Sequence, residues 1–378
     1  MQKNIKTVIA VVVVLLVGSG IYFATNNNKG GEQQPLTIGY IGPLTGPSAV
    51  LGMDAIKAIE IAVAETNEKG GINGQQVRLV AEDDQYLTKN TVSAYSKLVN
   101  TDKAKVIMIA TYGGVFAVAE QAKKDGVVVI DPLDCNSQVA NADKNIFCIA
   151  TETESIGYSL ADYMIENDMK KAGIMYSTKD SFMALVNDAF TKRYTEKGGV
   201  VQVESFNYDD TDFRTQLTKL KQGNADGLVL LGHDETGLIM KQARNLGINA
   251  KFLATGTITS PPAQQAAEGA AEGTVFAYWE ASADNALAKA FEGKFVAVVG
   301  RGPILPLTTH PAYDTTKLLL EVVFPNISAK MNVNDIKKEL LSVKGYMGTT
   351  GEISMDAMGA ARIKESVFKL VNGAPVKL

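Results

Sequence analysis

Residues 36–85 read LTIGYIGPLTGPSAVLGMDAIKAIEIAVAETNEKGGINGQQVRLVAEDDQ, and this stretch decides the fold class. A short β-rich run, Leu36–Ile41, ends at the Gly/Pro-rich turn Gly42–Pro47. Apolar side chains then recur at helical spacing, at Ile56, Ile59, Ala62 and Val63. A glycine turn and a second apolar run close the segment. Strand, helix and strand in this order predict an α/β fold with a parallel sheet, and a turn at the carboxyl end of such a strand predicts ligand binding.

The alternation of strands and helices continues along the chain in two series. The first series has strand candidates at 77–81, 106–110, 127–130 and 146–149, and helical stretches at 90–101 and 115–124. The second series has strand candidates at 172–176, 200–206, 227–231 and 251–254, and helical stretches at 155–167, 182–197, 213–222 and 236–246. Each series predicts a doubly wound parallel sheet. Because about 340 residues are more than one hydrophobic core usually organises, we expect two lobes.

The composition excludes several function classes. Hydrophobic residues make up 46% and charged residues 21%, as in ordinary globular proteins, and a net charge of −4 offers no basic surface to nucleic acid. The chain has no Gly-x-Ser-x-Gly, His-Glu-x-x-His or Walker-type motif, and its two cysteines and two histidines do not fit ordinary zinc spacing. The sequence therefore predicts a protein that is not an enzyme and that needs no cofactor or metal.

The N-terminal segment bears on localisation. Met1–Asn28 combines Lys3 and Lys6 with an apolar run of about 17 residues, which is the order of a secretory leader. The run is short for a spanning helix, and no small-x-small cleavage site stands out in it. We therefore expect a signal peptide or an uncleaved membrane anchor, which would be the only part of the chain to meet a membrane. Residues 29–35 read as a polar linker.

Cys135 and Cys148 are the only cysteines. In an exported chain such a pair can close a disulfide, whereas two buried thiols are the alternative. The sequence leaves both interpretations open.

Short motifs in a constant order give the chain a resemblance to a known family. They are Ile41–Gly46, Gly52, Gly70–Gly74, Asp83–Asp84, Ala225–Gly227, Gln242–Gly247, Tyr313–Asp314 and Gly351–Ile353. Each motif is weak alone, but together they extend from Leu36 to the end of the chain. They resemble the extracytoplasmic solute-binding proteins of the leucine/isoleucine/valine type, which are type I periplasmic binding proteins of ABC transporters.

The resemblance implies two doubly wound parallel-sheet lobes that are joined by a three-crossover hinge and close on a ligand. The chain would change lobe near Ile149–Thr153, near Gly273–Ala277 and near Met347–Gly351. The expected lobes are residues 36–151 plus 277–348 for lobe 1 and residues 152–276 plus 349–378 for lobe 2. The implied partners are a small-molecule ligand, either an amino acid or a related amine or amide, and the permease subunits of an ABC transporter.

Two turns of lobe 1 usually meet the carboxylate of an amino-acid ligand in this family, and here they read Thr111–Gly114 and Pro132–Cys135. Gly113 still offers a main-chain donor at a helix start, which suits an anion. Asp134 departs from the family pattern, because a carboxylate stands where a small neutral residue is usual. It would repel a ligand carboxylate. Alternatively, Asp134 is a turn residue that faces solvent.

Lobe 2 of the relatives usually supplies an acid for the ligand's ammonium group, but the matching turn, Ala254–Thr257, has none. In one hypothesis, Asp134 takes over the ammonium group while Thr255 or Thr257 offers a hydroxyl. In the other, the ligand is an amine or a neutral amide rather than an α-amino acid.

Further candidates come from aromatic residues and from positions that touch ligand in relatives, although ordinary packing is an alternative for each. The complete set of candidate ligand-binding residues is Leu51, Thr111, Tyr112, Gly113, Leu133, Asp134, Cys135, Phe182, His233, Gly256, Thr257 and Trp279. The resemblance thus implies an extracytoplasmic receptor that captures a small polar metabolite, a branched-chain or related amino acid, for an ABC transporter. A ligand-sensing domain that serves a membrane signalling partner is the alternative on the same fold.

Overall fold

The structure is a computed structural model that describes residues 34–378 apart from 47, 137, 208–209, 280–284 and 329–330. The expected leader Met1–Asn28 lies outside the described residues, as do most of the linker and Pro47 of the first turn. Residues Pro35–Leu378 form one compact unit. Within the described part of the chain, no helix is both long and apolar enough to cross a membrane.

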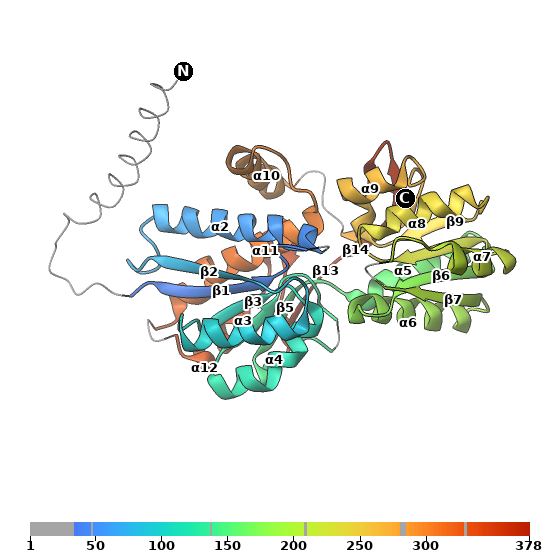
Figure 1. The fold of residues 1–378 in the computed structure, drawn as a ribbon. Helices are drawn as coiled ribbons and strands as arrows, with labels where there is room; N and C mark the ends of the chain where they lie inside the picture. The colour runs from blue at the N-terminus through green and yellow to red at the C-terminus, as the bar shows by residue number, and fades with distance from the viewer. Residues whose placement is uncertain (1–33, 47, 137, 208–209, 280–284, 329–330) are drawn as a thin grey trace, which may run out of the picture. The chain divides into compact units, whose positions relative to one another are not determined.

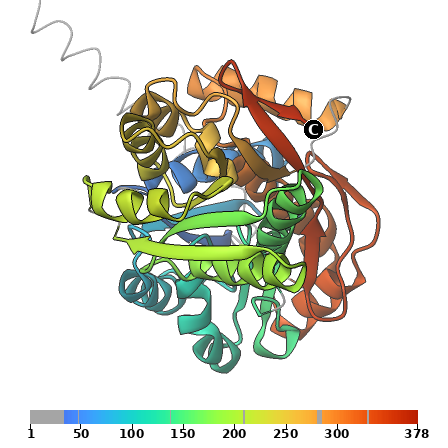
Figure 2. The same ribbon diagram turned by 90° about the vertical axis from the view of Figure 1, so that its right-hand side faces the viewer.

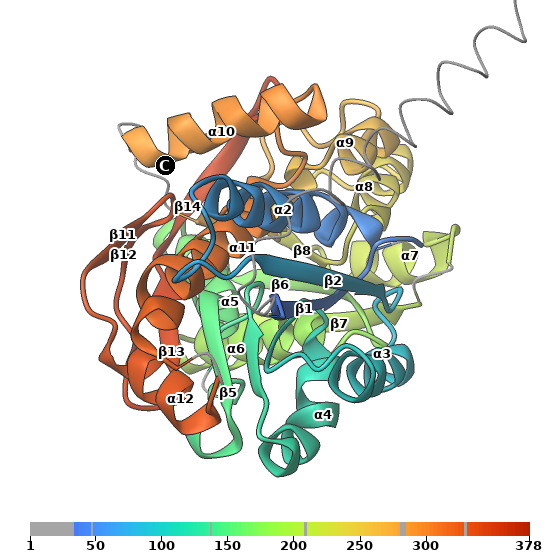
Figure 3. The same ribbon diagram turned by 90° about the vertical axis from the view of Figure 1, so that its left-hand side faces the viewer.

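Lobe 1 is built on a six-stranded parallel sheet with the strand order β13-β5-β4-β3-β1-β2 (Figures 1 and 3). Its strands are β1 (Leu36–Gly42), β2 (Val77–Asp83), β3 (Val106–Ile109), β4 (Val128–Asp131), β5 (Ile146–Thr151) and β13 (Ala360–Ile363). One hydrophobic core packs α2 (Met53–Glu68), α11 (Pro306–Leu318) and α12 (Val333–Ser342) on one face of the sheet. A second core packs α3 (Thr88–Asn100) and α4 (Tyr112–Asp125) on the other face.

Smaller elements complete lobe 1. Helix α10 (Ala286–Val299) packs beside α2 through Phe291 and Phe295, which share a buried cluster with Ile61. The remaining elements are the short helices η1 (Ala49–Leu51), η2 (Ala142–Lys144) and η5 (Phe324–Asn326), the π-helical turn η4 (Leu319–Val323) and the hairpin β11 (Tyr346–Gly348) and β12 (Gly351–Ile353).

Lobe 2 is built on a seven-stranded sheet with the strand order β15-β14-β10-β9-β8-β6-β7 (Figures 1 and 2). Its strands are β6 (Lys171–Ser177), β7 (Val200–Phe206), β8 (Gly227–Leu231), β9 (Lys251–Ala254), β10 (Val275–Trp279), β14 (Glu365–Val371) and β15 (Ala374–Lys377). Strands β6 to β10 are parallel, whereas β14 and β15 join antiparallel at the edge. The covering helices are α5 (Thr153–Glu166) and α6 (Ser181–Glu196) on one face, with α7 (Arg214–Gln222), α8 (Glu235–Asn245), η3 (Gly256–Thr259) and α9 (Pro261–Ala267) on the other.

Sheet membership confirms the two-lobed α/β class with three crossovers and corrects two of the expected positions. The first crossover lies between β5 and α5, as expected. The second follows Trp279 rather than Gly273–Ala277, because all of β10 pairs with β14 of the second sheet. The third lies between Ile363 and Glu365 rather than near Met347–Gly351, because β13 pairs with β5 and β14 with β10. The segment that suggested the third crossover forms the separate hairpin β11–β12.

Gly52 allows the first turn of the chain to close tightly. A Cβ on this residue would lie 2.2 Å from the carbonyl oxygen of Pro43, so any larger residue would push α2 away from the turn. On the other side, Asp83 of β2 accepts a hydrogen bond from the amide of Leu44 at 2.9 Å. These contacts fix the segment that carries Leu51, whose side chain is buried.

A buried carboxylate attaches the β11–β12 hairpin to α11. Asp314 accepts hydrogen bonds from the amides of Thr349 and Thr350, both at 2.8 Å, and from the Thr350 hydroxyl at 2.6 Å. Asn285, the N-cap of α10, donates to the carbonyl oxygens of Gly348 at 3.0 Å and of Thr349 at 2.9 Å. The hairpin turn is therefore held by two helices.

Candidate functional site

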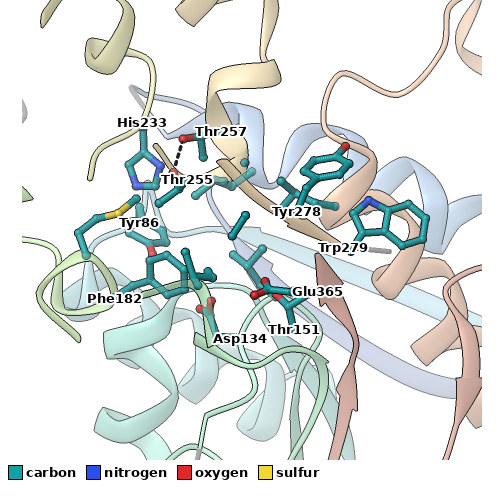
Figure 4. A pocket seen from close by; sticks show the side chains of 17 residues that line it. Tyr86, Asp134, Thr151, Phe182, His233, Thr255, Thr257, Tyr278, Trp279 and Glu365 are labelled. Carbon is teal, nitrogen blue, oxygen red and sulfur yellow. Dashed lines mark hydrogen bonds between the residues drawn. The ribbon is translucent and has the colours of Figure 1, made fainter. Parts of the chain in front are cut away.

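A pocket lies where loops of the two lobes meet, at the carboxyl ends of the parallel strands (Figure 4). About 530 Å³ inside it, the open mouth included, is free of protein atoms. Its described lining consists of Leu51, Tyr86, Leu133, Asp134, Thr151, Ile156, Phe182, Met183, His233, Thr255, Gly256, Thr257, Ala277, Tyr278, Trp279, Leu307 and Glu365.

The structure brings together part of the expected ligand-binding set. The candidates that line the pocket are Leu51, Leu133, Asp134, Phe182, His233, Gly256, Thr257 and Trp279. The candidates that lie outside its described lining are Thr111, Tyr112, Gly113 and Cys135.

The glycines at the start of α4 serve helix packing. A Cβ on Gly113 would lie 2.6 Å from Oγ1 of Thr88, and one on Gly114 would lie 2.5 Å from Cγ2 of Thr91. Both threonines belong to α3, so the two glycines let α3 and α4 approach closely. The role of the Gly113 main-chain amide as a donor to a ligand carboxylate stays a prediction.

Tyr112 is buried behind the pocket wall. Its ring packs edge-on against Phe182 with 6.2 Å between the ring centroids. Its hydroxyl accepts a hydrogen bond of 2.5 Å from Nδ2 of Asn136. Thr111, the N-cap position of α4, is also buried. The expected aromatic wall is therefore supplied by Phe182, with Tyr112 as its support.

Cys135 forms a disulfide with Cys148, the interpretation that the sequence left open beside two free thiols. Both side chains are fully buried. Because Cys148 lies on β5, the disulfide joins this central strand to the turn that follows β4. The cysteine next to Asp134 thus has a structural role in this turn.

The turn after β4 carries two buried carboxyl groups. Asp131 accepts hydrogen bonds from the amides of Leu133 at 2.8 Å and Asp134 at 2.9 Å, and burial raises the pKa of Asp131 to about 7. Asp134 is 2% exposed, and within the described residues its Oδ2 has no hydrogen-bond partner. Burial, together with the charges of Asp131 and Asp180, raises the pKa of Asp134 well above its usual range. The sequence alternative of a solvent-facing Asp134 is therefore not what the structure shows.

A buried histidine–aspartate pair lies on the lobe 2 side. Asp180 is the N-cap of α6, and its Oδ1 accepts hydrogen bonds from the amides of Phe182 at 2.9 Å and Met183 at 3.3 Å. Its Oδ2 lies 3.0 Å from Nε2 of His233. Burial opposes protonation of His233, but the hydrogen bond and negative charge of Asp180 outweigh it and raise the pKa of His233. A protonated His233 is therefore already neutralised by its partner. The ring edge of Tyr86 lies against the imidazole, 5.7 Å between centroids.

Glu365 is the functional candidate that the sequence reasoning missed. It is the first residue of β14, directly after the third crossover, and its Oε2 accepts a 2.6 Å hydrogen bond from the Ser155 hydroxyl. Removal from bulk solvent raises the pKa of Glu365 to about 7, a shift that hydrogen bonds from Ser155 and Thr151 reduce and the charge of Glu152 increases. The signal was a carboxylate at the first position of β14. It could be read only once the third crossover was placed correctly.

The remaining wall is apolar and aromatic. Trp279 and Tyr278 lie side by side in β10 with 6.4 Å between their ring centroids, and they form the side of the pocket opposite His233 (Figure 4). Between these sides lie the aliphatic side chains of Leu51, Leu133, Ile156, Met183, Ala277 and Leu307. Such a surface suits the hydrocarbon part of a small ligand.

The hydroxyl groups of η3 are directed into the protein. Oγ1 of Thr257 donates to the carbonyl oxygen of Gly232 at 2.9 Å and lies 2.7 Å from Oγ1 of Thr255. The two hydroxyls thus have partners before any ligand arrives.

The titratable groups of the pocket are predominantly acidic. Asp134 and Glu365 face it, whereas the described lining contains neither lysine nor arginine. Among the residues described, no group of three or more His, Cys, Asp or Glu side chains could hold a metal ion. The described lining thus offers carboxyl groups and an apolar surface.

Comparison with known proteins gives consistent results. The profile of the periplasmic binding protein family matches residues 35–365. A Leu/Ile/Val-binding protein homolog 3 from Brucella melitensis is 30% identical over 278 residues, 72% of this chain and 75% of that protein. The branched-chain amino acid transporter substrate binding protein LivJ from Streptococcus pneumoniae, solved with isoleucine, has a TM-score of 0.81 at 27% identity and covers 91% of this chain and 100% of that chain. A solute binding protein of an ABC transporter from R. palustris, solved with benzoate, shares the fold with a TM-score of 0.78 at 22% identity over 91% of this chain and 95% of that chain.

Proposed function

Because the chain belongs to the periplasmic binding protein family, we propose that it is an extracytoplasmic receptor that captures a small polar metabolite and delivers it to the permease subunits of an ABC transporter. In this proposal the ligand is a branched-chain or related amino acid. The observation that carries the proposal is the lining of the pocket, which takes side chains from the loops of both lobes. The relatives are named as binding proteins, so the site is assigned binding and no catalysis.

We assign residues 36–151 plus 285–363 to lobe 1 and residues 152–279 plus 364–378 to lobe 2. In the proposed cycle the lobes close over the ligand about the three crossovers. A ligand that contacts both lobes favours the closed arrangement, because opening would remove half of its contacts.

A second ligand class, amines and neutral amides, is supported by one observation. In its ionised form, Asp134 in the turn after β4 would repel a ligand carboxylate. Sensing for a membrane signalling partner is the alternative to delivery. Permease and ATPase genes next to this gene would support delivery, and a kinase or chemoreceptor gene would support sensing.

Trp279 gives a direct test of ligand binding, because it is the single tryptophan of the chain and lines the pocket. We expect leucine, isoleucine or valine, or an amine of similar size, to change its fluorescence and to stabilise the protein. At a ligand concentration of 100 Kd the expected gain in unfolding free energy is about 2.7 kcal/mol.

The matched variants for this test are Leu51→Ala in the pocket and Leu87→Ala on the surface, where the leucine is 54% exposed. Leu51→Ala should weaken binding about tenfold or more through lost apolar contact, and Leu87→Ala should not. If neither fluorescence nor melting temperature responds to any amino acid, amine or amide of the panel, the receptor function is rejected.

We also propose that Met1–Asn28 directs export, as a cleaved signal peptide or as an uncleaved anchor. When the full chain is expressed in a bacterium, we expect it outside the cytoplasm. The intact mass of the recovered protein distinguishes the two forms. A full-length protein that remains in the cytosolic fraction would contradict export.

A further inference from the structure

The pocket contains two carboxyl groups, and its described lining has no lysine or arginine that could pair with them. His233 is paired with Asp180. Asp134 and Glu365 therefore face the cavity without a basic partner of their own there. Figure 4 shows both carboxyl groups on the same side of the cavity, away from His233 and Thr257. A ligand that neutralises them must bring its own positive charge.

Several hydrogen-bond donors that could bind a ligand carboxylate already donate to protein groups. In the turns after β4 and before α6, the amides of lining residues already donate to Asp131 and Asp180. The Thr257 hydroxyl donates to the carbonyl oxygen of Gly232. Among the described lining, the buried Oδ2 of Asp134, an acceptor, and Nε1 of Trp279, a donor, have no hydrogen-bond partner. A buried acceptor without a partner is costly, so it marks the position of a donor that the ligand supplies.

We propose that the pocket selects a ligand with a protonated amine and no carboxylate, which places its amine at Asp134 and Glu365 and its hydrocarbon part against Phe182 and Trp279. This inference rests on the proposed receptor function and, of the two ligand classes named there, selects the amines in place of the amino acids. Asp134 belongs to lobe 1, and Glu365 begins the last strand segment that enters lobe 2. The amine thus bridges the two lobes.

The surroundings of the two acids predict that binding is linked to protonation. Around Glu365 stand the hydroxyls of Ser155 and Thr151 and the charge of Glu152, which itself pairs with Arg362 at 3.1 Å. Removal from solvent and the charge of Glu152 favour the protonated form of Glu365, whose pKa is raised to about 7.

Around Asp134 stand Asp131, Asp180, the His233 ring behind Asp180 and the Tyr112 hydroxyl. The pKa of Asp134 is also raised, first by burial and then by the neighbouring acids. An ammonium group binds the ionised carboxylates, so it displaces protons from both acids at neutral pH.

The test uses ligands that share one branched hydrocarbon part. Isoamylamine is leucine without its carboxylate, isocaproate is leucine without its amine, and isocaproamide is the neutral amide. Affinities of the purified protein are measured by titration calorimetry in buffers with different ionisation enthalpies. We expect isoamylamine to bind at least about tenfold more tightly than leucine and to release protons. Below the pKa of Glu365, about 7, its affinity should rise with pH by about tenfold per pH unit for each proton released.

The variants Asp134→Asn and Glu365→Gln keep the side-chain shapes and remove the charges. Each variant should lower the affinity for isoamylamine about tenfold or more and reduce the number of protons released when it binds. The affinity for isocaproamide should change little. Asp143→Asn and Glu352→Gln make the same chemical changes at exposed residues outside the pocket, and should leave all affinities unchanged. Thermal melting of each ligand-free variant verifies that it is folded.

The outcomes separate this inference from the receptor function. If leucine binds more tightly than isoamylamine, the amine class is wrong and the receptor function stands. Tighter binding of isocaproate or isocaproamide has the same meaning. If isoamylamine binds equally well to Asp134→Asn and Glu365→Gln, the assignment of the two carboxylates is wrong. If none of these ligands and no amino acid binds, the receptor function itself fails.

Discussion

We expect the free energy of unfolding of the double variant Cys135→Ala/Cys148→Ala to be about 3 kcal/mol lower than that of the wild type. Without the disulfide, the unfolded chain regains the conformational entropy of an open loop. The two cysteines are separated by 13 positions. Urea denaturation followed by Trp279 fluorescence measures the change. Ligand affinity should fall as well, since Cys135 is the neighbour of Asp134 in the turn.

Wild-type protein in dithiothreitol is the control for this variant, because it loses the same covalent bond and keeps both sulfur atoms. Its stability should approach that of the double variant. The amide of Cys135 still donates to the carbonyl oxygen of Thr151 at 3.0 Å, so the turn keeps part of its position after reduction. Equal stability of the double variant and the oxidised wild type would show that the disulfide does not constrain the chain.

The second large effect is expected from Asp314→Ala. This substitution leaves the buried amides of Thr349 and Thr350 and the Thr350 hydroxyl without their acceptor. The expected loss is about 3 kcal/mol of unfolding free energy or more, since unsatisfied buried donors cost about 1–3 kcal/mol each. Hydrogen exchange should rise first at the amides of the β11–β12 turn.

The conservative variant Asp314→Asn provides the comparison. It keeps one carbonyl oxygen for the two amides, so it should lose clearly less stability than Asp314→Ala. A loss below about 1 kcal/mol for Asp314→Ala would mean that solvent replaces the carboxylate and that the hairpin is not held by α11.

Local patterns in the sequence predicted most of the fold. The strand–turn–helix–strand order of residues 36–85 appears as β1, α2 and β2, and the expected strands of both series are present within a few residues. These elements were predictable because helical and strand periodicity are properties of neighbouring residues. The continuous apolar runs 106–109 and 127–130 became β3 and β4, buried on both faces.

The third crossover was not predictable in the same way. Residues 346–353 have the short β-rich pattern of a crossing strand, but they pair only with each other. The strand that completes the first sheet is β13, which pairs with β5 across more than half of the chain. Such a pairing depends on which edge of the sheet has no neighbouring strand. The β-propensity of neighbouring residues does not predict which edge this is. For the same reason Glu365 was missed.

The candidate site was predictable where a strand end fixed it. Leu133, Asp134, His233 and Thr257 follow strands whose ends the sequence located, and all four line the pocket. Glycine at a helix start suits anion binding and close helix packing equally well, and the sequence did not predict the packing. The close approach of Thr88 to Gly113 shows the packing role, and the donor role stays a prediction.

The division of lobe 1 between the two ends of the chain determines when it can be completed. Helix α2 packs against α11, and Lys317 of α11 donates to Glu65 of α2 across 252 positions. Strands β6 to β10 of lobe 2, in contrast, are consecutive. During synthesis the central strands of lobe 2 are complete while α11 and α12 do not yet cover their part of the lobe 1 sheet. The first-made half of lobe 1 therefore keeps part of its core exposed until the chain has passed Ser342.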